Sequence, residues 1–401
     1  MHVGGNVSSS SYGWVIVAAV ATMLAIAMGQ LVNGLSVFVV PLEAEFGWSR
    51  GAIALINSAG LLGLAIGGVA MGVIADRTSV RTVAFIGALA VGVCVSLAAG
   101  ADRLWQFYLV FFLAGVFGAA LFGPLITLVG SWFPAGAGLA IGVASAGQAV
   151  GQGGVPFGTA FLIESMGWRG TFLTLGLSSL VIMVPLALSL REPPRAALSS
   201  PSPAVSSLPI SPTMATVWLS AAVLLCCACM SVPLMHLVPL IQALCISAPD
   251  ASGVLFVMLM AAIAGRVAFG KLADLVGAIP AYMTASLWQT VAVFAFTRIE
   301  DLALFYVFAP VYGFGYAGVM TGVLVTTRAL TPASRRATLM GVILAFAWLG
   351  HGLGGFQGGY FFDLTATYTV SFANAALAGA ANLLILGILL FQVRRRVAAA
   401  A

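Results

Sequence analysis

The sequence predicts an all-α membrane protein with twelve transmembrane helices. Of its 401 residues, 61% are hydrophobic and only 7% are charged, and the mean hydropathy is +1.11. A soluble domain carries about 25% charged residues, so this composition excludes an ordinary globular protein. The long segments are apolar on all faces, whereas the strands of a transmembrane β-barrel alternate polar and apolar residues. At about 20 residues per helix, the chain holds about a dozen spans.

Charged residues and Pro/Gly breaks separate twelve apolar segments along the chain. Residues 104–163 contain no Asp, Glu, Lys or Arg and are too long for one span. We therefore place a turn at Trp132-Phe133-Pro134. The expected spans are residues 13–40, 51–74, 82–100, 105–131, 137–163, 168–190, 214–240, 252–273, 279–297, 302–327, 337–360 and 367–392.

The distribution of Lys and Arg predicts which ends face the cytoplasm. Eleven of the sixteen basic residues fall in the termini and even-numbered loops, four fall in the opposite loops, and Arg266 lies inside a span. Because cytoplasmic loops carry the excess of Lys and Arg, both termini are expected to be cytoplasmic. The expected localisation is a multi-pass protein of the cell (inner) membrane.

A Pro- and Ser-rich segment divides the chain into two halves. Residues 191–213 hold six Pro and six Ser among 23 residues, a composition typical of a flexible linker. The expected organisation is a six-helix bundle at 1–190, a cytoplasmic linker at 191–213 and a second six-helix bundle at 214–401.

The two halves are a sequence repeat. Gly72-Val-Ile-Ala-Asp76 recurs 198 residues later as Gly270-Lys-Leu-Ala-Asp274, and Val-Pro-Leu at 40–42 recurs at 238–240 with the same offset. Matches in one register over most of a half indicate a duplication. Two related halves of six spans predict a pseudo-symmetric bundle with a midplane cavity, which is an architecture of secondary transporters.

Two motifs resemble those of a known family. Gly72-Val-Ile-Ala-Asp76-Arg77-Thr-Ser-Val-Arg81 resembles the loop 2–3 signature of the major facilitator superfamily, with Ser79 in place of its second Gly. The stretch from Trp132 to Gly147 resembles the fifth-span motif of monocarboxylate transporters, without its basic residues, and that family's first-span motif survives as Tyr12-Gly-Trp14. The resemblance implies the major facilitator fold and, in part, a relationship to oxalate:formate antiporters.

Arg266 lies inside the eighth span, five residues before Lys271. An Arg at the bilayer centre costs about 2.5–3.5 kcal/mol, and no carboxylate lies well inside any span. We interpret it as a ligand for an anionic substrate, because its planar fork fits a carboxylate; the alternative is snorkelling to the interface beside Lys271. The resemblance implies the same role, since monocarboxylate transporters carry an Arg there, although their Asp four residues earlier is Ala262 here.

Other polar residues in the spans are candidates for substrate and proton. Asn33 could hydrogen-bond substrate or make a helix contact, and Tyr316, four residues after Tyr312, could line the cavity or pack. His236 and His351 are the proton-carrier candidates, because imidazole titrates near pH 6.5; a structural, hydrogen-bonded His is the alternative for both.

Four charged residues at span ends are candidates for gating. Asp76, Arg77 and Arg81 follow the second span and Asp274 follows the eighth. They are expected to form a charge latch that holds the outward-facing state; setting topology is the alternative.

The expected function is secondary active transport of a small monocarboxylate such as L-lactate, together with a proton, by alternating access. The alternative is an organic-anion exchanger of the oxalate:formate type. One internal cation favours a monoanion, since a second buried carboxylate would be costly. No metal or nucleotide motif is present, so no cofactor and no enzymatic activity are expected. Beyond the substrate, the proton and the lipid bilayer, no nucleic acid partner is expected, and the protein is expected to be a monomer.

Overall fold

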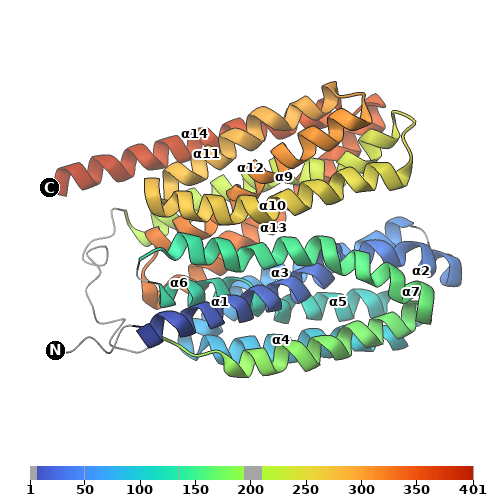
Figure 1. Cartoon of the computed structure of the whole chain (residues 1–401), viewed down its shortest axis with the longest axis horizontal. Helices are drawn as coiled ribbons and strands as arrows, with labels where there is room; N and C mark the ends of the chain where they lie inside the picture. Colours follow the sequence, from blue (N-terminus) through green and yellow to red (C-terminus); the bar gives the residue numbers. More distant parts are fainter. Residues whose placement is uncertain (1–6, 49, 134, 194–209, 401) are drawn as a thin grey trace. The chain divides into compact units, whose positions relative to one another are not determined.

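The computed structural model describes residues 7–48, 50–133, 135–193 and 210–400, and every regular element within them is a helix (Figure 1). The predicted all-α fold class is confirmed. Several helices begin at a residue whose side chain accepts a backbone N–H of the first turn, which satisfies a donor that the helix itself leaves free. Ser79, Ser211, Ser247 and Asp301 cap helices in this way.

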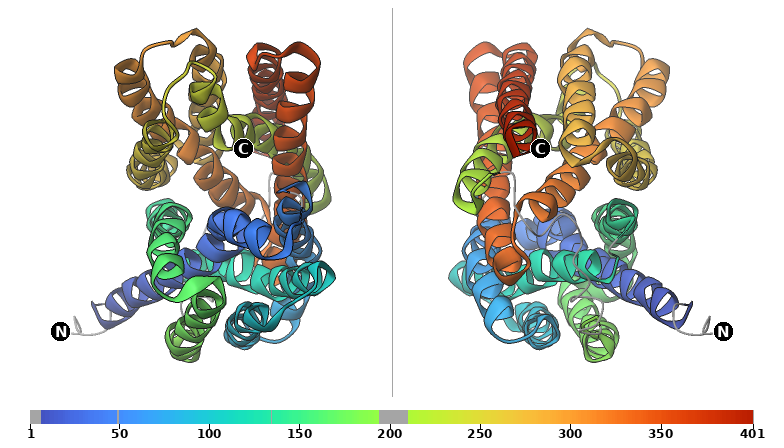
Figure 2. Two further views of the ribbon diagram at one scale, coloured as in Figure 1. Left: turned by 90° about the vertical axis from the view of Figure 1, so that its right-hand side faces the viewer. Right: turned by 90° about the vertical axis from the view of Figure 1, so that its left-hand side faces the viewer.

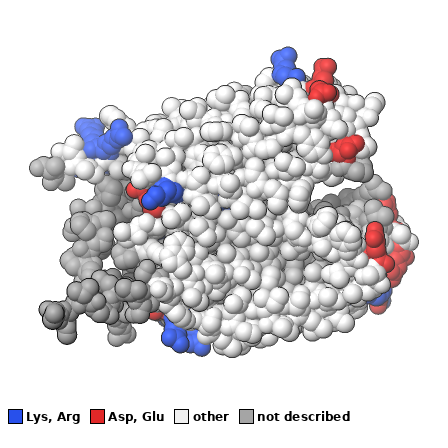
Figure 3. Space-filling model, in the orientation of Figure 1, with Lys and Arg blue, Asp and Glu red and all other residues white. Residues whose placement is uncertain are grey.

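Within the described residues, eleven helices are long and apolar enough to cross a membrane. The longest, α7 (Ala137–Ser189), contains a kink at Gly167, whose φ of 69° and ψ of 170° are not helical. The kink divides α7 into two helical parts, which correspond to the predicted fifth and sixth spans. With α7 counted as two spans, the eleven helices account for the twelve predicted spans. On the face shown in Figure 3, charged side chains lie toward the helix ends and the band between them is uncharged.

The chain divides into two compact units. The first comprises Met1–Pro201 and Ala333–Ala345, and the second comprises Ser202–Pro332 and Phe346–Ala401. Residues 194–209 of the predicted linker lie outside the described residues. The domain boundaries at 190 and 214 therefore stay predictions, next to the observed end of α7 at Ser189 and the start of α9 at Pro212. The end views in Figure 2 show the helices of each unit running side by side.

The first unit contains the first six spans and the start of α13. Its first span is not a uniform helix, because a π-helical and a 3₁₀ segment follow α1. The elements are α1 (Val7–Met28), η1 (Gly29–Asn33), η2 (Gly34–Phe38), α2 (Val39–Phe46), α3 (Arg50–Arg77), α4 (Val80–Leu97), η3 (Ala98–Gly100), α5 (Leu104–Gly118), η4 (Ala119–Leu121), α6 (Gly123–Trp132), α7, and η6 (Ala333–Arg335) leading into α13 (Arg336–Thr365).

The second unit contains the remaining spans. Its helices are α9 (Pro212–Gln242), α10 (Ala248–Val276), α11 (Ala278–Val293), η5 (Phe294–Arg298), α12 (Leu302–Leu330), the rest of α13, and α14 (Thr369–Ala400).

Glycine allows the helices to pack backbone against backbone. A Cβ at Gly147 or Gly151 of α7 would lie 2.0 or 1.9 Å from the carbonyl oxygen of Ala21 or Ala25 in α1. The pairs Gly63/Gly67 (α3 on α5) and Gly350/Gly354 (α13 on α9) make similarly close contacts, and a Cβ at Gly72 of α3 would lie 2.5 Å from Ala337 O of α13. Lipid removes the hydrophobic drive between helices, so such small-residue contacts carry much of the packing.

An ion-pair cluster joins three loops at one end of the first unit. Arg169, two residues after the kink, donates to Glu45 at 2.9 Å and to Asp102 at 2.8 Å. The guanidinium also lies 4.2 Å from the ring of Trp168, and the Trp168 indole N–H donates to Glu45. The cluster therefore ties the ends of α2, the loop before α5 and the α7 kink together.

We expect Gly151→Ala to destabilise the protein by about 1–3 kcal/mol, because its Cβ would overlap the Ala25 backbone and force α1 and α7 apart. Gly154→Ala is the matched control, since a Cβ at Gly154 of the same helix meets nothing within 4 Å. Thermal melting of both variants in detergent measures the difference, and equal melting temperatures would contradict this packing.

Candidate functional site

The candidate site lies in the second unit, around the guanidinium of Arg266 on α10. The side chain is only 2% exposed. Its Nε and Nη1 have no hydrogen-bond partner among the described residues. Snorkelling would expose the charged group, so this burial argues against that alternative. A buried guanidinium with free donors can accept a carboxylate.

The backbones of α10 and α12 approach closely beside Arg266. Cβ atoms at Gly313 and Gly265 would lie 2.1 Å from Met258 O and 2.0 Å from Phe314 O. The Thr321 hydroxyl also donates to the Arg266 carbonyl oxygen at 3.4 Å. Later residues of α10 contact later residues of α12, from Met258 with Gly313 to Arg266 with Thr321. The two helices therefore run in the same direction.

Two tyrosines of α12 accompany Arg266. Tyr316 is 2% exposed and interacts electrostatically with Arg266. Tyr312 is fully buried and its ring stacks on that of Tyr316, with centroids 5.5 Å apart and planes 13° apart. The structure therefore brings the predicted residues Arg266 and Tyr316 together, with Tyr312 beside them. The sequence signal for Tyr312 was its position four residues before Tyr316, which places the two side chains on the same face of the helix.

His236 lies on α9 and contacts α13. Its Nε2 donates to Gly355 O at 2.8 Å; because a carbonyl only accepts, Nε2 carries the hydrogen. Its ring lies 5.4 Å from that of Tyr368, which lines a cavity of about 190 Å³ together with the exposed Glu300. His351 is half-buried on α13, with its ring 6.5 Å from that of Trp348.

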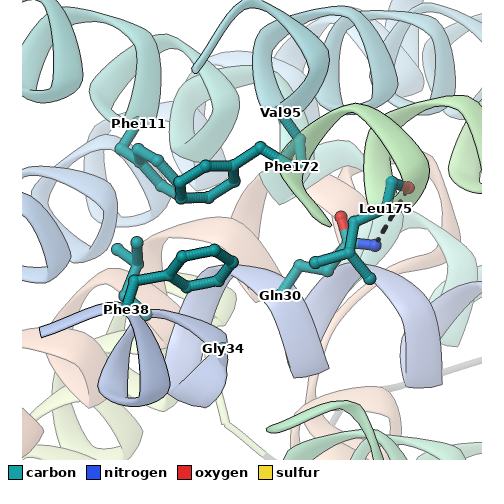
Figure 4. Close-up of a pocket in the computed structure, with 8 residues that line it drawn as sticks. Gln30, Gly34, Phe38, Val95, Phe111, Phe172 and Leu175 are labelled. Carbon is teal, nitrogen blue, oxygen red and sulfur yellow. Dashed lines mark hydrogen bonds between the residues drawn. The ribbon is translucent and has the colours of Figure 1, made fainter. Parts of the chain in front are cut away.

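Gln30 is one of the buried polar side chains of the first unit, and the sequence analysis did not select it. Its Nε2 donates to Ser179 Oγ at 2.8 Å. It also donates to Leu175 O at 3.4 Å (Figure 4). The adjoining cavity, lined by Phe38 and Phe172 among others, measures about 10 Å³ and is too small for a carboxylic acid. The predicted Asn33 is half-buried at the end of the π-helical segment η1.

The carboxylate of Asp76 contacts the start of helix α13, which is far from Asp76 in the sequence. Its carboxylate accepts the backbone N–H groups of Ala337 at 3.1 Å and Thr338 at 2.8 Å, and the Thr338 hydroxyl at 2.6 Å. These donors belong to the first turn of α13 in the first unit, where the helix dipole favours an anion. Arg77 and Arg81 are exposed.

Asp274, the repeat partner of Asp76, has a different neighbour in the second unit. It interacts electrostatically with Arg328 in the last turn of α12. The sequence analysis did not pair these residues, because their contact depends on how α10 and α12 pack.

The two motifs that carried the family resemblance meet in the first unit. Tyr12 and Trp14 at the start of α1 contact Trp132 and Phe133 at the end of α6, with ring centroids 5.5 and 5.2 Å apart. The Trp132 indole N–H also donates to Arg191 O at 2.9 Å, which fixes the chain where it leaves α7.

The family model described as Major Facilitator Superfamily matches residues 15–242. This chain belongs to the major facilitator superfamily. The superfamily membership predicted from the loop 2–3 signature is confirmed, and the chain is a multi-pass membrane transporter, not an enzyme.

Curated relatives of this superfamily member include monocarboxylate transporters. Monocarboxylate transporter 13 of Rattus norvegicus is 28% identical over 394 residues, covering 94% of this chain and 89% of the relative. Monocarboxylate transporter 3 of Rattus norvegicus is 31% identical over 175 residues, covering 43% and 35%. These similarities agree with the branch that the fifth-span motif indicated.

Solved structures of the superfamily share the fold. The proton:xylose symporter XylE aligns with a TM-score of 0.79 at 15% identity, covering 94% of this chain and 95% of that one. The human organic anion transporter MFSD10 aligns with a TM-score of 0.71 at 13% identity, covering 93% and 99%. The predicted major facilitator fold is thereby confirmed.

We expect Asp76→Ala to speed hydrogen exchange at the amides of Ala337 and Thr338, because both lose a charge-assisted acceptor. Losing such a cap costs about 0.5–2 kcal/mol of stability. Hydrogen–deuterium exchange with mass spectrometry measures the change, and peptides from the capped start of α12 provide an internal reference. Unchanged exchange at the start of α13 would rule out the cap.

Proposed function

We propose that this protein is a secondary active transporter of small monocarboxylates of the lactate or pyruvate type, and that Arg266 binds the substrate carboxylate. The observation that carries the proposal is the buried guanidinium whose Nε and Nη1 have no partner among the described residues. A planar anion with two oxygens matches that pair of donors, and Tyr316 beside it can donate a further hydrogen bond. The names of the curated relatives support the same substrate class.

A monoanion fits this site better than a dianion. No other described Arg or Lys is buried as Arg266 is. A second carboxylate would therefore enter a low-dielectric region without a partner, which costs several kcal/mol. The resemblance to oxalate:formate antiporters implies a second cation in the eleventh span, near Ala347 in this sequence, and Ala347 is a buried apolar residue of α13.

We further propose that the substrate moves with a proton and that His236 carries it. With Nε2 donating to Gly355, Nδ1 is the position that can accept a proton. Tyr368 places the imidazole close to a cavity that includes exposed residues, so protons have a short route from water. Exchange of organic anions without a proton is the competing function, favoured by Ala262 at the position where monocarboxylate transporters carry Asp.

Transport by alternating access requires a contact that forms and breaks. We propose that the Asp76 cap on α13 is this latch. Arg77 at the end of α3, Arg81 in the first turn of α4 and Asp274 near the end of α10 contribute charge. Its hydrogen bonds are individually modest, so a few kcal/mol of differential substrate binding can shift the equilibrium. The excess of Lys and Arg supports placing this end, and both termini, in the cytoplasm.

We expect Arg266→Ala to lower kcat/KM for L-lactate about 100-fold or more, because breaking a buried charge pair costs about 3–5 kcal/mol. Arg266→Lys keeps the charge but loses the fork, and should lower kcat/KM about tenfold or more. Uptake of labelled lactate into proteoliposomes measures both. Wild-type rates in the Lys variant would refute bidentate binding, and unchanged affinity in the Ala variant would place the site elsewhere.

We expect His236→Gln to flatten the pH dependence of lactate uptake while lactate exchange without a pH gradient continues. Gln can still donate to the Gly355 carbonyl but cannot take up a proton in this pH range. Uptake and internal pH are followed together in proteoliposomes, and His351→Gln is the matched control. An unaltered pH profile and proton flux would show that His236 is structural; uptake by the parent without proton flux would favour the exchanger.

A further inference from the structure

The second unit has a cavity at the end where α9 begins and where the apolar part of α14 finishes. It measures about 430 Å³ and is lined by Met214 of α9 and by Gln392, Arg395 and Arg396 of α14. Ligand pockets in proteins usually measure about 300–1,000 Å³. All four residues belong to the second unit, so the cavity is a feature of one compact body. Figure 1 shows this end of α14 extending beyond α11.

The cavity carries two positive charges. Positions 392, 395 and 396 are three and four residues apart, which places their side chains on one face of α14. Arg395 and Arg396 have no ion-pair or hydrogen-bond partner among the described residues. Met214 lies in the first turn of α9, where the helix dipole adds positive potential. Such a site favours a phosphate, whose oxygens match the planar guanidinium fork.

Gln392 adds a hydrogen-bond acceptor to the same cavity. Its Oε1 is buried, and no described group donates to it. An amide oxygen accepts hydrogen bonds only, and the oxygens of an ionised phosphate also only accept. The phosphate itself therefore cannot satisfy Gln392. A ligand that satisfies the whole cavity brings a hydroxyl as well as an anionic group.

An exposed apolar stripe on α14 leads to this cavity. Leu384 and Phe391 are 67% and 65% exposed, and Ile388 between them is 38% exposed. Steps of four, three and four residues place these side chains and Arg395 along one line of the helix. From Leu384 to Arg395 the helix rises about 17 Å, close to half of a hydrocarbon core of about 30 Å. The stripe thus has the length of an acyl chain whose head group lies at Arg395.

We propose that the cavity binds the head group of an anionic phospholipid, phosphatidylglycerol. The phosphate meets Arg395 and Arg396, a hydroxyl of the terminal glycerol donates to Gln392 Oε1, and an acyl chain lies along the stripe from Leu384 to Phe391. Phosphatidylcholine has the same phosphate, but it carries a cation toward the two guanidinium groups and offers no donor to Gln392. None of these residues takes part in the proposed transport mechanism, so the two proposals can fail independently.

Native mass spectrometry of the full-length protein in detergent tests the charge of the site. The probes are phosphatidylglycerol and phosphatidylcholine with identical acyl chains. We expect the parent to bind phosphatidylglycerol about tenfold or more tightly, and Arg395→Ala or Arg396→Ala to weaken that binding about fivefold or more. Arg394→Ala is the matched control, because it removes the same charge from a neighbouring position that does not line the cavity. An exposed charge away from the ligand contributes little, so this variant should stay within about twofold of the parent.

A change at Gln392 tests the head-group hydroxyl. Gln392→Leu removes the acceptor and should weaken binding of phosphatidylglycerol about threefold or more. Phosphatidate has the phosphate but no terminal glycerol, so its binding should stay within about twofold in the same variant. An equal loss for both lipids, or no loss for phosphatidylglycerol, would show that the terminal glycerol is not what Gln392 recognises and would overturn the assignment.

Three other results would overturn the lipid site. Equal weakening by Arg394→Ala and Arg395→Ala would indicate a general attraction of charge. Equal binding of the two probes by the parent would exclude an anionic site. Equal thermal stabilisation of the parent by glycerol phosphate, which has no acyl chain, would indicate a soluble phosphate ligand.

Melting temperatures measured without added lipid control for folding. Arg394, Arg395 and Arg396 are all exposed, so their Ala variants should melt as the parent does. If a variant folds poorly, thermal stabilisation of the parent by phosphatidylglycerol against phosphatidylcholine decides. Equal stabilisation overturns the proposal, and stabilisation by phosphatidylglycerol alone supports it.

Discussion

The burial of one guanidinium in a lipid-embedded helix is the constraint on which the second unit depends. Placing Arg266 at this depth costs a few kcal/mol, and the sequence offers no acid within the spans to offset it. The glycine contacts between α10 and α12 let the two backbones approach, and this brings Tyr316 to the charge without neutralising it. Because Nε and Nη1 of Arg266 lack partners among the described residues, they remain available to bind an anion. The close packing of α10 and α12 holds the guanidinium in position.

In the first unit, close backbone packing and a change of helix type occur along the same span. Gly147 and Gly151 of α7 contact the regular helix α1, and the close packing continues at Gly29, where the π-helical segment η1 begins. Backbone groups freed by such a segment must be satisfied inside the membrane. With its amide oriented to donate, Asn57 of α3 reaches the carbonyls of Leu31 and Val32 at 3.2 and 3.1 Å. Such segments are common at functional sites in helices.

The duplication determines where the charged residues lie but not what they contact. Asp76 and Asp274 occupy equivalent positions 198 residues apart, yet one caps the start of α13 and the other meets Arg328. The position 198 residues before Arg328 is Gly130, so the first half has no equivalent cation. An internal repeat therefore predicts the placement of a motif in each half, while single substitutions elsewhere decide its chemistry.

The sequence by itself determined the helical class, the twelve spans, the repeat, the superfamily and the isolation of Arg266. These properties follow from hydropathy and charge, which act locally along the chain because each span must satisfy its backbone and side chains in lipid. The tertiary structure alone decided the hydrogen-bond partners: Gln30 with Ser179, Asp76 with Thr338, and Tyr282 with Asn382. A hydrogen bond forms between atoms within about 3 Å, and residues 100 or more positions apart reach that distance only through the packing of whole helices.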